Sequence, residues 1–237
     1  MQNKFLKAKR EIVDNNIYLN KQINKKPTQR FIQTLNIIKS KLNKKIKFCD
    51  VGCATGGFID YVKKNFPNNE FFGIEKSIPL IKKCKRNFPY VKLIMLDIEK
   101  KNNLKIKFDC ITMIGILMNF DDPKKSIRNC LKMLNKNGIL VIYSPFNEFP
   151  IDTITRSKRS SNDYWELGWN IHSKSTIEKI LKSLKVKKFK WKDFLVNFNL
   201  KKKKDPLRVW TVSVNGKKTL FNGASQYVDG KFLIITK

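Results

Sequence analysis

A glycine-rich turn holds the residues of this sequence that are best suited to bind a ligand. Residues 46–51 form an apolar run typical of a buried strand, and Gly52, Gly56 and Gly57 follow it directly. Glycines allow the backbone to approach a ligand closely. The first turn of a helix also offers free N–H groups and the positive end of its dipole to an anion. The turn therefore predicts a binding site for a phosphate or a carboxylate.

Two well-known phosphate-binding patterns do not fit this turn. The dinucleotide fingerprint G-x-G-x-x-G needs glycine at positions 52, 54 and 57, but position 54 is Ala54, and the Gly-Lys-Ser/Thr of a P-loop is absent. Acidic residues do recur at the expected strand ends: Asp50, then Glu75 25 residues later, then Asp97. A carboxylate at such a position accepts ribose hydroxyls in dinucleotide-binding folds. Asp97 has a structural alternative, because aspartate also caps strand–helix loops.

Strands and helices are expected to alternate along residues 46–144. Apolar runs predict strands over residues 46–51, 70–75, 91–96, 108–114 and 139–143. Helical spacing of apolar residues lies between these runs, and Asn137-Gly138 is expected to end the last helix, whose inner face includes Leu134. The alternation predicts an α/β fold with a doubly wound, Rossmann-like, mostly parallel sheet. Ligands bind beyond the carboxyl ends of such strands, where the acidic residues fall.

The rest of the chain is expected to complete the sheet and to cover its ligand-binding edge. Residues 145–172 are predicted to be irregular, followed by a helix over about 175–184 and strands over 187–194 and 232–236, which makes seven strands with an antiparallel last one. Asn215-Gly216 predicts a β-hairpin between residues 209–214 and 217–221. We expect a helical N-terminal lead-in over residues 1–45 and one domain over 46–237. Substrate-side insertions are expected at about 145–172 and 195–230.

Residues 48–57 resemble the first motif of class I S-adenosylmethionine (SAM)-dependent methyltransferases of the small-molecule type. In that family an acidic residue and then G-x-x-x-G lie between the first strand and the first helix. Glu75 and Asp97 match the acidic positions at the next two strand ends, and residues 109–120 and 131–140 resemble later motifs. The resemblance spans about residues 46–144 and implies SAM as the cofactor. The cofactor-binding residues that it implies are Asp50, Gly52, Cys53, Ala54, Gly56, Glu75, Lys76, Asp97, Ile98, Ile114 and Met118.

The methyl acceptor is expected to bind between the loop after the fourth strand and residues 145–172. Many relatives carry His where this chain has Asn119, so the resemblance leaves a general base unassigned. His172 is the one side chain suited to proton transfer at neutral pH, with an ordinary loop residue as the alternative. Arg156 and Arg159 are expected either to clamp a carboxylate or phosphate or to be solvated at the surface. The predicted catalytic residue is His172, and the predicted substrate-binding residues are Asn119, Asn147, Arg156, Tyr164 and Trp169.

The net charge of +31 raises RNA as an alternative acceptor. The chain has 43 Lys but 7 Arg, whereas proteins that read nucleic acids favour Arg for bidentate contacts. The lysines are spread along the whole chain, as the composition of an A/T-rich genome would produce, and the Asn-Pro-Pro-Tyr-type signature of nucleic-acid N-methyltransferases is absent. We expect transfer to a small polar metabolite or sugar-type acceptor. An RNA methyltransferase is the second hypothesis, and a non-catalytic SAM-fold partner subunit is the third.

The composition also bears on metals and location. The five cysteines form no C-x-x-C pair and the chain has one His, so neither a metal site nor a disulfide framework is expected. No apolar run has the length that spans a bilayer, and the basic N-terminus lacks the apolar stretch of a secretory signal. We therefore expect a cytoplasmic enzyme whose partner is a small-molecule substrate.

Overall fold

The computed structural model describes residues 11–20, 26–161, 163–203, 205 and 207–237. The described part of the expected N-terminal lead-in contains α1 (Glu11–Asn20), and residues 1–10 and 21–25 lie outside the described residues. The division of the chain into a lead-in and one domain with two insertions stays a prediction. Among the described helices, none has the length and apolar character that crossing a membrane requires.

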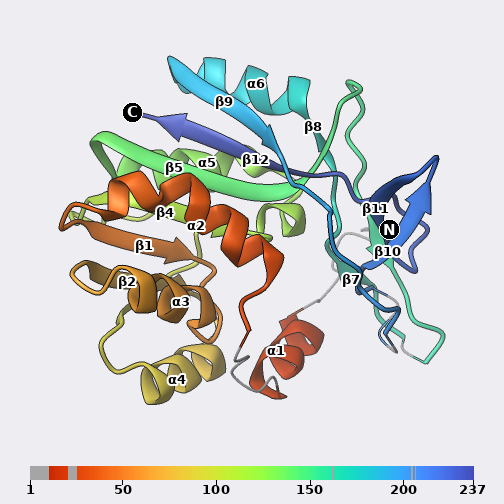
Figure 1. The fold of residues 1–237 in the computed structure, drawn as a ribbon, viewed down its shortest axis with the longest axis horizontal. Helices are drawn as coiled ribbons and strands as arrows, with labels where there is room; N and C mark the ends of the chain where they lie inside the picture. Colours follow the sequence, from red (N-terminus) through yellow and green to blue (C-terminus); the bar gives the residue numbers. More distant parts are fainter. Residues whose placement is uncertain (1–10, 21–25, 162, 204, 206) are drawn as a thin grey trace, which may run out of the picture.

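A seven-stranded path forms the centre of the molecule, in the order β3-β2-β1-β4-β5-β12-β9, with the short β8 paired to the end of β5 (Figure 1). The first five strands run parallel, whereas β12 is antiparallel to both of its neighbours. The predicted α/β, mostly parallel sheet with an antiparallel last strand is therefore confirmed. The bounds of these strands are β1 (Lys47–Val51), β2 (Glu70–Glu75), β3 (Lys92–Met95), β4 (Phe108–Ile114), β5 (Leu134–Asn147), β8 (His172–Ser173), β9 (Lys188–Asp193) and β12 (Gly230–Thr236).

Helices cover both faces of the sheet, as a doubly wound fold requires. Side chains of β5 alternate between two apolar clusters: Val141 faces one cluster, and Leu140 and Ile142 face the other. The first cluster includes residues of α2 (Gln29–Leu42), α3 (Gly57–Asn65) and α4 (Ile78–Asn87). The second cluster includes residues of α5 (Pro123–Met133) and α6 (Lys174–Ser183). Because both faces are buried, the central strands are almost continuously apolar.

The predicted end of the helix before the fifth strand, at Asn137-Gly138, is wrong. Helix α5 ends at Met133, and Leu134 begins β5, where it pairs with Phe108. Residues 135–138 bulge out before Ile139 resumes the pairing with β4. Asn137 does adopt a positive φ of 63°, but its N–H donates to the carbonyl of Lys237 at 2.8 Å. The Asn-Gly pair therefore joins the chain to its own C-terminus instead of capping a helix.

The carboxyl ends of the parallel strands face a group of short elements (Figure 1). In the segment predicted to be irregular, the structure forms β6 (Arg156–Ser157) and β7 (Glu166–Leu167), which pair with each other, and β8. The predicted hairpin is confirmed as β10 (Trp210–Val214) and β11 (Lys217–Phe221). Its turn residues Asn215 and Gly216 have φ values of 48° and 74°, as a type I′ turn requires.

Candidate functional site

The turn between β1 and α3 is held against the neighbouring strand β2. The N–H groups of Gly52 and Cys53 both donate to the carbonyl of Ile74, at 2.8 and 3.2 Å. The N–H of Gly56 donates to the carbonyl of Cys53 at 2.9 Å, and α3 begins at the next residue. The free N–H groups of the first turn of α3 therefore lie at the carboxyl end of β1, where an anionic group of a ligand can accept from them.

Two glycines of this turn are required by the packing around them. Gly52 has a φ of 71°, and a Cβ there would lie 2.6 Å from Cγ2 of Ile116. Gly56 has a φ of 83°, and its Cβ would lie 2.6 Å from Sγ of Cys84. Even Ala54 adopts a positive φ of 49°, which L-residues rarely do. The turn is thus shaped by left-handed backbone and by side chains that leave no room for a Cβ.

Asp50 is a buried carboxyl group directly beneath the turn. The hydroxyl of Thr112, on the neighbouring strand β4, donates to Oδ1 of Asp50 at 2.7 Å. Burial raises the pKa of Asp50 to about 7; the hydrogen bond from Thr112 acts against this rise and the negative charge of Glu75 adds to it. A cationic ligand beside Asp50 would favour the ionised carboxylate.

Replacing Asp50 with Asn is expected to stabilise the cofactor-free protein at neutral pH and to flatten the pH dependence of its stability. The folded state holds the carboxyl proton of Asp50 more tightly than the unfolded chain, because the folded pKa of about 7 lies above the ordinary value of 3.8. The contribution of Asp50 to stability is thus fully present below the unfolded pKa and is lost as the pH rises to about 7. This loss lowers the free energy of unfolding by about 4 kcal/mol at most. Denaturant unfolding of the wild type and of Asp50→Asn between about pH 4 and pH 8 measures this difference. If the free energy of unfolding changed with pH equally in the two proteins, the prediction would be contradicted.

Glu75 ends β2 and joins the turn to the next loop. Its Oε2 accepts the N–H of Ala54 at 3.0 Å, and its Oε1 accepts the N–H groups of Lys76 and Ser77 at 2.9 and 3.0 Å. The side chain of Lys76 is exposed. A carboxylate has about four acceptor positions, so Glu75 retains capacity for a hydroxyl donor of a ligand.

The loop after β3 places Asp97 and Ile98 beside the end of β2. Glu75 pairs with Met95 in the sheet, and Asp97 follows two residues later. Asp97 is half-buried, and its Oδ1 accepts the N–H of Glu99 at 3.1 Å. Ile98 is buried, and its carbonyl accepts Nδ2 of Asn129 from α5 at 2.7 Å. The side chain of Asn129 therefore fixes this loop to the core.

The segment after β4 completes this edge of the sheet. Ile114 ends β4 half-buried, and the short helix η2 (Leu117–Asn119) follows. Met118 is half-buried in η2, and its carbonyl accepts the N–H of Asn170 at 2.9 Å. Oδ1 of Asn119 is buried and has no hydrogen-bond partner among the described residues. An acceptor atom in that state is suited to a ligand that donates a hydrogen bond.

The structure brings together three of the residues predicted for the acceptor side. The buried ring of His172 donates from Nε2 to the carbonyl of Phe120 at 2.9 Å. The guanidinium of Arg156 is buried and pairs with Asp121. The backbone carbonyl of Trp169 accepts Nε2 of Gln226 at 3.2 Å and the hydroxyl of Thr155, the residue before Arg156, also at 3.2 Å.

Two further predicted substrate-binding residues, Asn147 and Tyr164, lie apart from this group. Asn147 closes the loop after β5, because its Nδ2 donates to the carbonyl of Ile151 at 3.0 Å and its Oδ1 accepts the N–H of Phe149 at 3.1 Å. Tyr164 is 37% exposed. Among the described residues, no hydrogen bond joins Asn147 or Tyr164 to the group around Phe120 and Asp121. Arg159 is half-buried and pairs with Glu166 at 2.9 Å and with Asp205 at 3.0 Å.

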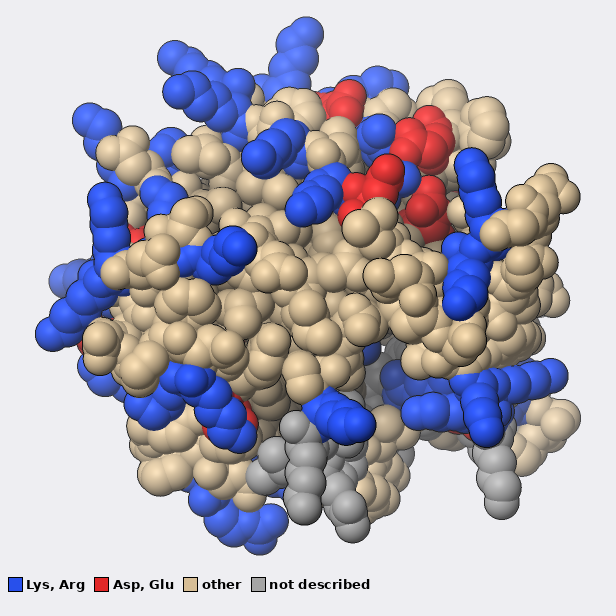
Figure 2. Space-filling model, viewed as in Figure 1, with Lys and Arg blue, Asp and Glu red and all other residues tan. Residues whose placement is uncertain are grey.

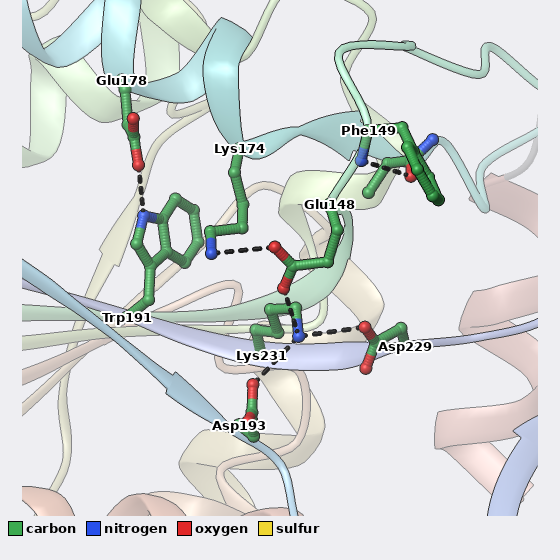
Figure 3. Close-up of polar contacts among 9 residues, drawn as sticks. Glu148, Phe149, Lys174, Glu178, Trp191, Asp193, Asp229 and Lys231 are labelled. Carbon is green, nitrogen blue, oxygen red and sulfur yellow. Dashed lines mark hydrogen bonds and ion pairs between the residues drawn. The ribbon is translucent and has the colours of Figure 1, made fainter.

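A buried lysine anchors the start of the acceptor-side segment (Figure 3). Nζ of Lys231 contacts Glu148 at 2.8 Å, and Asp193 and Asp229 at 2.9 Å each. Burial lowers the pKa of Lys231, but the hydrogen bonds to the three carboxylates outweigh this and raise it. Glu148 also contacts Lys174 of α6 at 3.0 Å. The chain leaving β5 is therefore fixed to β9, β12 and α6 before it turns over the site.

Three residues of the site were missed by the sequence analysis: Thr112, Gln226 and Arg30. A hydroxyl within the mostly apolar strand β4 was the available signal for Thr112. Arg30 lies in the first turn of α2, with its guanidinium carbon 5.9 Å from the ring centroid of Tyr143, which pairs with Ile114 within β5. Neither Gln226 nor Arg30 stands in a recognisable pattern. The described residues contain no group of three or more His, Cys, Asp or Glu side chains arranged to hold a metal ion.

Comparison with known proteins identifies related sequences. A family model described as a methyltransferase domain matches residues 42–199. A tRNA (guanine-N(7)-)-methyltransferase of Mycoplasma capricolum is 26% identical over 192 residues, which cover 73% of this chain and 87% of that protein. A tRNA U34 carboxymethyltransferase of Campylobacter jejuni is 26% identical over 130 residues, which cover 51% of this chain and 43% of that protein.

Solved structures share the fold at low sequence identity. The N-methyltransferase NodS from Bradyrhizobium japonicum, in complex with S-adenosylhomocysteine (SAH), has a TM-score of 0.56 at 14% identity, over 95% of this chain and 97% of that chain. Magnesium protoporphyrin IX methyltransferase from Synechocystis, with bound SAH, has a TM-score of 0.56 at 11% identity, over 95% and 94% of the two chains. These similarities concern the whole fold, including the segments after β5.

Proposed function

The chain belongs to the methyltransferase-domain family, and we propose that it transfers the methyl group of SAM to a small polar metabolite or sugar-type acceptor. When bound, SAM supplies a methyl group made electrophilic by the sulfonium ion. The rest of the chemistry falls to the chain's own residues, which bind the donor, orient both reactants and exclude water.

The residues around the glycine-rich turn fit SAM. Gly52 and Gly56 allow the left-handed backbone and the close packing that shape the turn, and Asp50 and Glu75 place two buried carboxyl groups beside it. The family resemblance assigns the amino-acid end of SAM to Asp50 and the backbone near Gly56, and the ribose hydroxyls to Glu75. Asp97 and Ile98 are assigned to the adenine. All of these assignments fall at the carboxyl ends of β1, β2 and β3.

The hydrogen bonds that join the acceptor-side segments are the observation that carries the choice of a small acceptor. Nδ2 of Asn170 donates to the carbonyl of Phe120 at 3.1 Å and to Asp121 at 2.9 Å. Nε2 of Gln226 donates to the hydroxyl of Thr155 at 2.8 Å. Three segments distant in sequence are thus bonded together next to η2, and two of them are the predicted substrate-side insertions. These hydrogen bonds fix the three segments relative to one another, and a preformed site of this kind suits a ligand of metabolite size.

The proposed role of His172 as a general base is compatible with its hydrogen bond. Because Nε2 donates to the carbonyl of Phe120, Nδ1 is the nitrogen left to accept a proton. A base is needed only when the acceptor atom carries a proton at neutral pH. Alignment of the acceptor with the methyl group supplies most of the rate enhancement in this proposal.

Transfer to tRNA is the second candidate function, and one relative favours it. The Mycoplasma capricolum relative is a tRNA methyltransferase by name, and the alignment covers 87% of its length. The lysines offer phosphate contacts, but Figure 2 shows Lys and Arg side chains scattered over the visible face, with most of the visible Asp and Glu in one area. RNA recognition would instead favour a continuous basic surface beside the site.

We expect the methyl label of radioactive SAM to enter the low-molecular-weight fraction of a cell extract and not purified tRNA. The lysines should give tRNA binding that is non-specific and falls steeply with salt, since it depends on released counterions. Filter binding of tRNA at several salt concentrations and scintillation counting of both fractions measure this. Label in tRNA that persists at physiological salt, and is absent with the Glu75→Gln variant, would contradict the proposal and support the second candidate.

A further inference from the structure

Two cysteine side chains, Cys53 and Cys84, are in contact beside the glycine-rich turn. Cys53 lies in the turn itself, directly after Gly52, and Cys84 lies in α4. Their thiol groups are joined by a hydrogen bond. Sγ of Cys84 also lies 2.6 Å from the position that a Cβ on Gly56 would occupy, so this sulfur packs directly against the turn. Two different elements therefore bring two sulfur atoms together at the edge of the site.

The contact between the two thiols is fixed by the packing around it. Sγ of Cys53 lies 2.6 Å from the Cβ position of Gly73, so this glycine on β2 makes room for the sulfur. Both cysteine side chains are buried in the apolar cluster that includes residues of α3 and α4. The N–H of Cys53 donates to the carbonyl of Ile74 at 3.2 Å, and its carbonyl accepts the N–H of Gly56 at 2.9 Å. Any movement of Cys53 therefore moves the backbone of the turn.

The hydrogen bond gives the two thiols different reactivities. It lowers the pKa of Cys84, against burial and the negative charges of Asp50 and Glu75, which raise it. The same hydrogen bond raises the pKa of Cys53, and burial adds to that rise. Because the thiolate is the nucleophilic form of cysteine, Cys84 is the more reactive of the two. By contrast, burial raises the pKa of Cys130 in α5 to about 12, which keeps that thiol unreactive at neutral pH.

We propose that hydrogen peroxide oxidises Cys84 and Cys53 to a disulfide and that this modification weakens SAM binding at the glycine-rich turn. The Cys84 thiolate attacks one peroxide oxygen and the O–O bond breaks. A sulfenic acid forms, and the released hydroxide takes up the proton that the Cys84 thiol gave up. Sγ of Cys53 then attacks the sulfur of the sulfenic acid, and its hydroxyl leaves as water with the proton of Cys53. The two thiols thus lose two hydrogen atoms, and peroxide is reduced to two molecules of water.

The disulfide weakens SAM binding because it changes the shape of the turn. A covalent bond brings the two sulfur atoms closer together than their hydrogen bond does, so the turn and α4 must shift relative to each other. The inference rests on the proposed function in one respect, namely that SAM binds at this turn. Both thiols are buried, so peroxide reaches them during local openings of the turn. Because bound SAM opposes such openings, oxidation acts on the cofactor-free protein.

Oxidation of the purified protein with hydrogen peroxide tests this inference with two readouts. Mass spectrometry of alkylated peptides should show a disulfide between Cys53 and Cys84 in the oxidised wild type. Calorimetric titration should show that oxidation weakens SAH binding by about 5–150-fold, the usual range of coupling between two sites. Dithiothreitol should then restore both the free thiols and the original affinity.

Two serine variants separate this pair from the other oxidisable side chains. Cys84→Ser keeps a hydrogen-bonding side chain of similar size but cannot form the disulfide, so its SAH affinity should be the same before and after peroxide. Cys130→Ser, which removes a buried thiol from α5, is the matched control. It should lose SAH affinity on oxidation to the same extent as the wild type.

The outcomes separate this inference from the assignment of the donor. Reduced wild-type protein that does not bind SAH would overturn the SAM site, whatever the peptide mapping shows. Oxidised wild type without a disulfide between Cys53 and Cys84, or with this disulfide and unchanged SAH affinity, would overturn the inference alone. An equal loss of affinity in Cys84→Ser and the wild type would also overturn it, because that loss comes from oxidation elsewhere. Circular dichroism melting shows whether each variant is folded, and the wild-type readouts need no substitution.

Discussion

Gly52→Ala is expected to abolish SAH binding and to lower the free energy of unfolding by about 2–5 kcal/mol. The left-handed backbone at Gly52, with a φ of 71°, accounts for about 1–2 kcal/mol of this when a Cβ is added. The clash of that Cβ with Ile116, at 2.6 Å, adds about 1–3 kcal/mol of overpacking. Binding is lost because relief of the clash must move the turn or Ile116, and both line the proposed site.

Gly216→Ala provides the matched control for this prediction. Gly216 has nearly the same φ, 74°, but a Cβ there meets no atom within 4 Å. It lies in the turn between β10 and β11, so the substitution adds the backbone strain without the clash. Denaturant unfolding should show a loss of about 1–2 kcal/mol, with SAH binding retained. Equal losses of stability in the two variants, with binding intact in both, would contradict the packing described around Gly52.

Glu75→Gln is expected to weaken SAH binding by about 10–100-fold while the protein stays folded. The carboxylate accepts three backbone N–H groups, from Ala54, Lys76 and Ser77, and is proposed to accept the ribose hydroxyls as well. The amide keeps one acceptor oxygen and turns the other position into a donor facing N–H groups. Hydrogen bonds to charged groups contribute about 1.5–3 kcal/mol, which sets the expected range. Calorimetric titration with SAH measures it.

Glu70→Gln is the control on the same strand. Glu70 begins β2, at the end opposite Glu75, and pairs with Lys92 at the surface. Because that ion pair is exposed, its loss should leave both the SAH affinity and the stability close to those of the wild type. If Glu75→Gln bound SAH as tightly as Glu70→Gln did, the ribose would have to lie elsewhere.

The sequence allowed the sheet and the donor side of the site to be predicted, because both depend on local patterns. Residues 108–114 are mostly apolar and therefore predict the buried strand β4. Gly52 and Gly56 directly follow a strand, so the turn predicts a ligand site. The end of α5 could not be predicted in the same way. Leu134 fits the helical spacing, but its pairing with Phe108 across the sheet decides its conformation.

The missed features of the site depend on contacts between distant parts of the chain. Arg30 lies in a segment without a motif, and its neighbours are distant in sequence: Gly115 follows β4, and Tyr143 lies within β5. The reason that Gly56 is required is equally non-local, since Cys84 of α4 occupies the space beside it. Arg156 appeared as a candidate for binding substrate, whereas the structure pairs it with Asp121. Its direct contact with the acceptor stays a prediction.

A crystal structure of the protein with SAH tests the proposed donor site most directly. The ribose hydroxyls are expected within hydrogen-bond distance, about 2.6–3.2 Å, of the carboxylate of Glu75, with the methionine part beside Gly52. SAH bound away from the turn, with Glu75 still contacting only the N–H groups of Ala54, Lys76 and Ser77, would contradict the account.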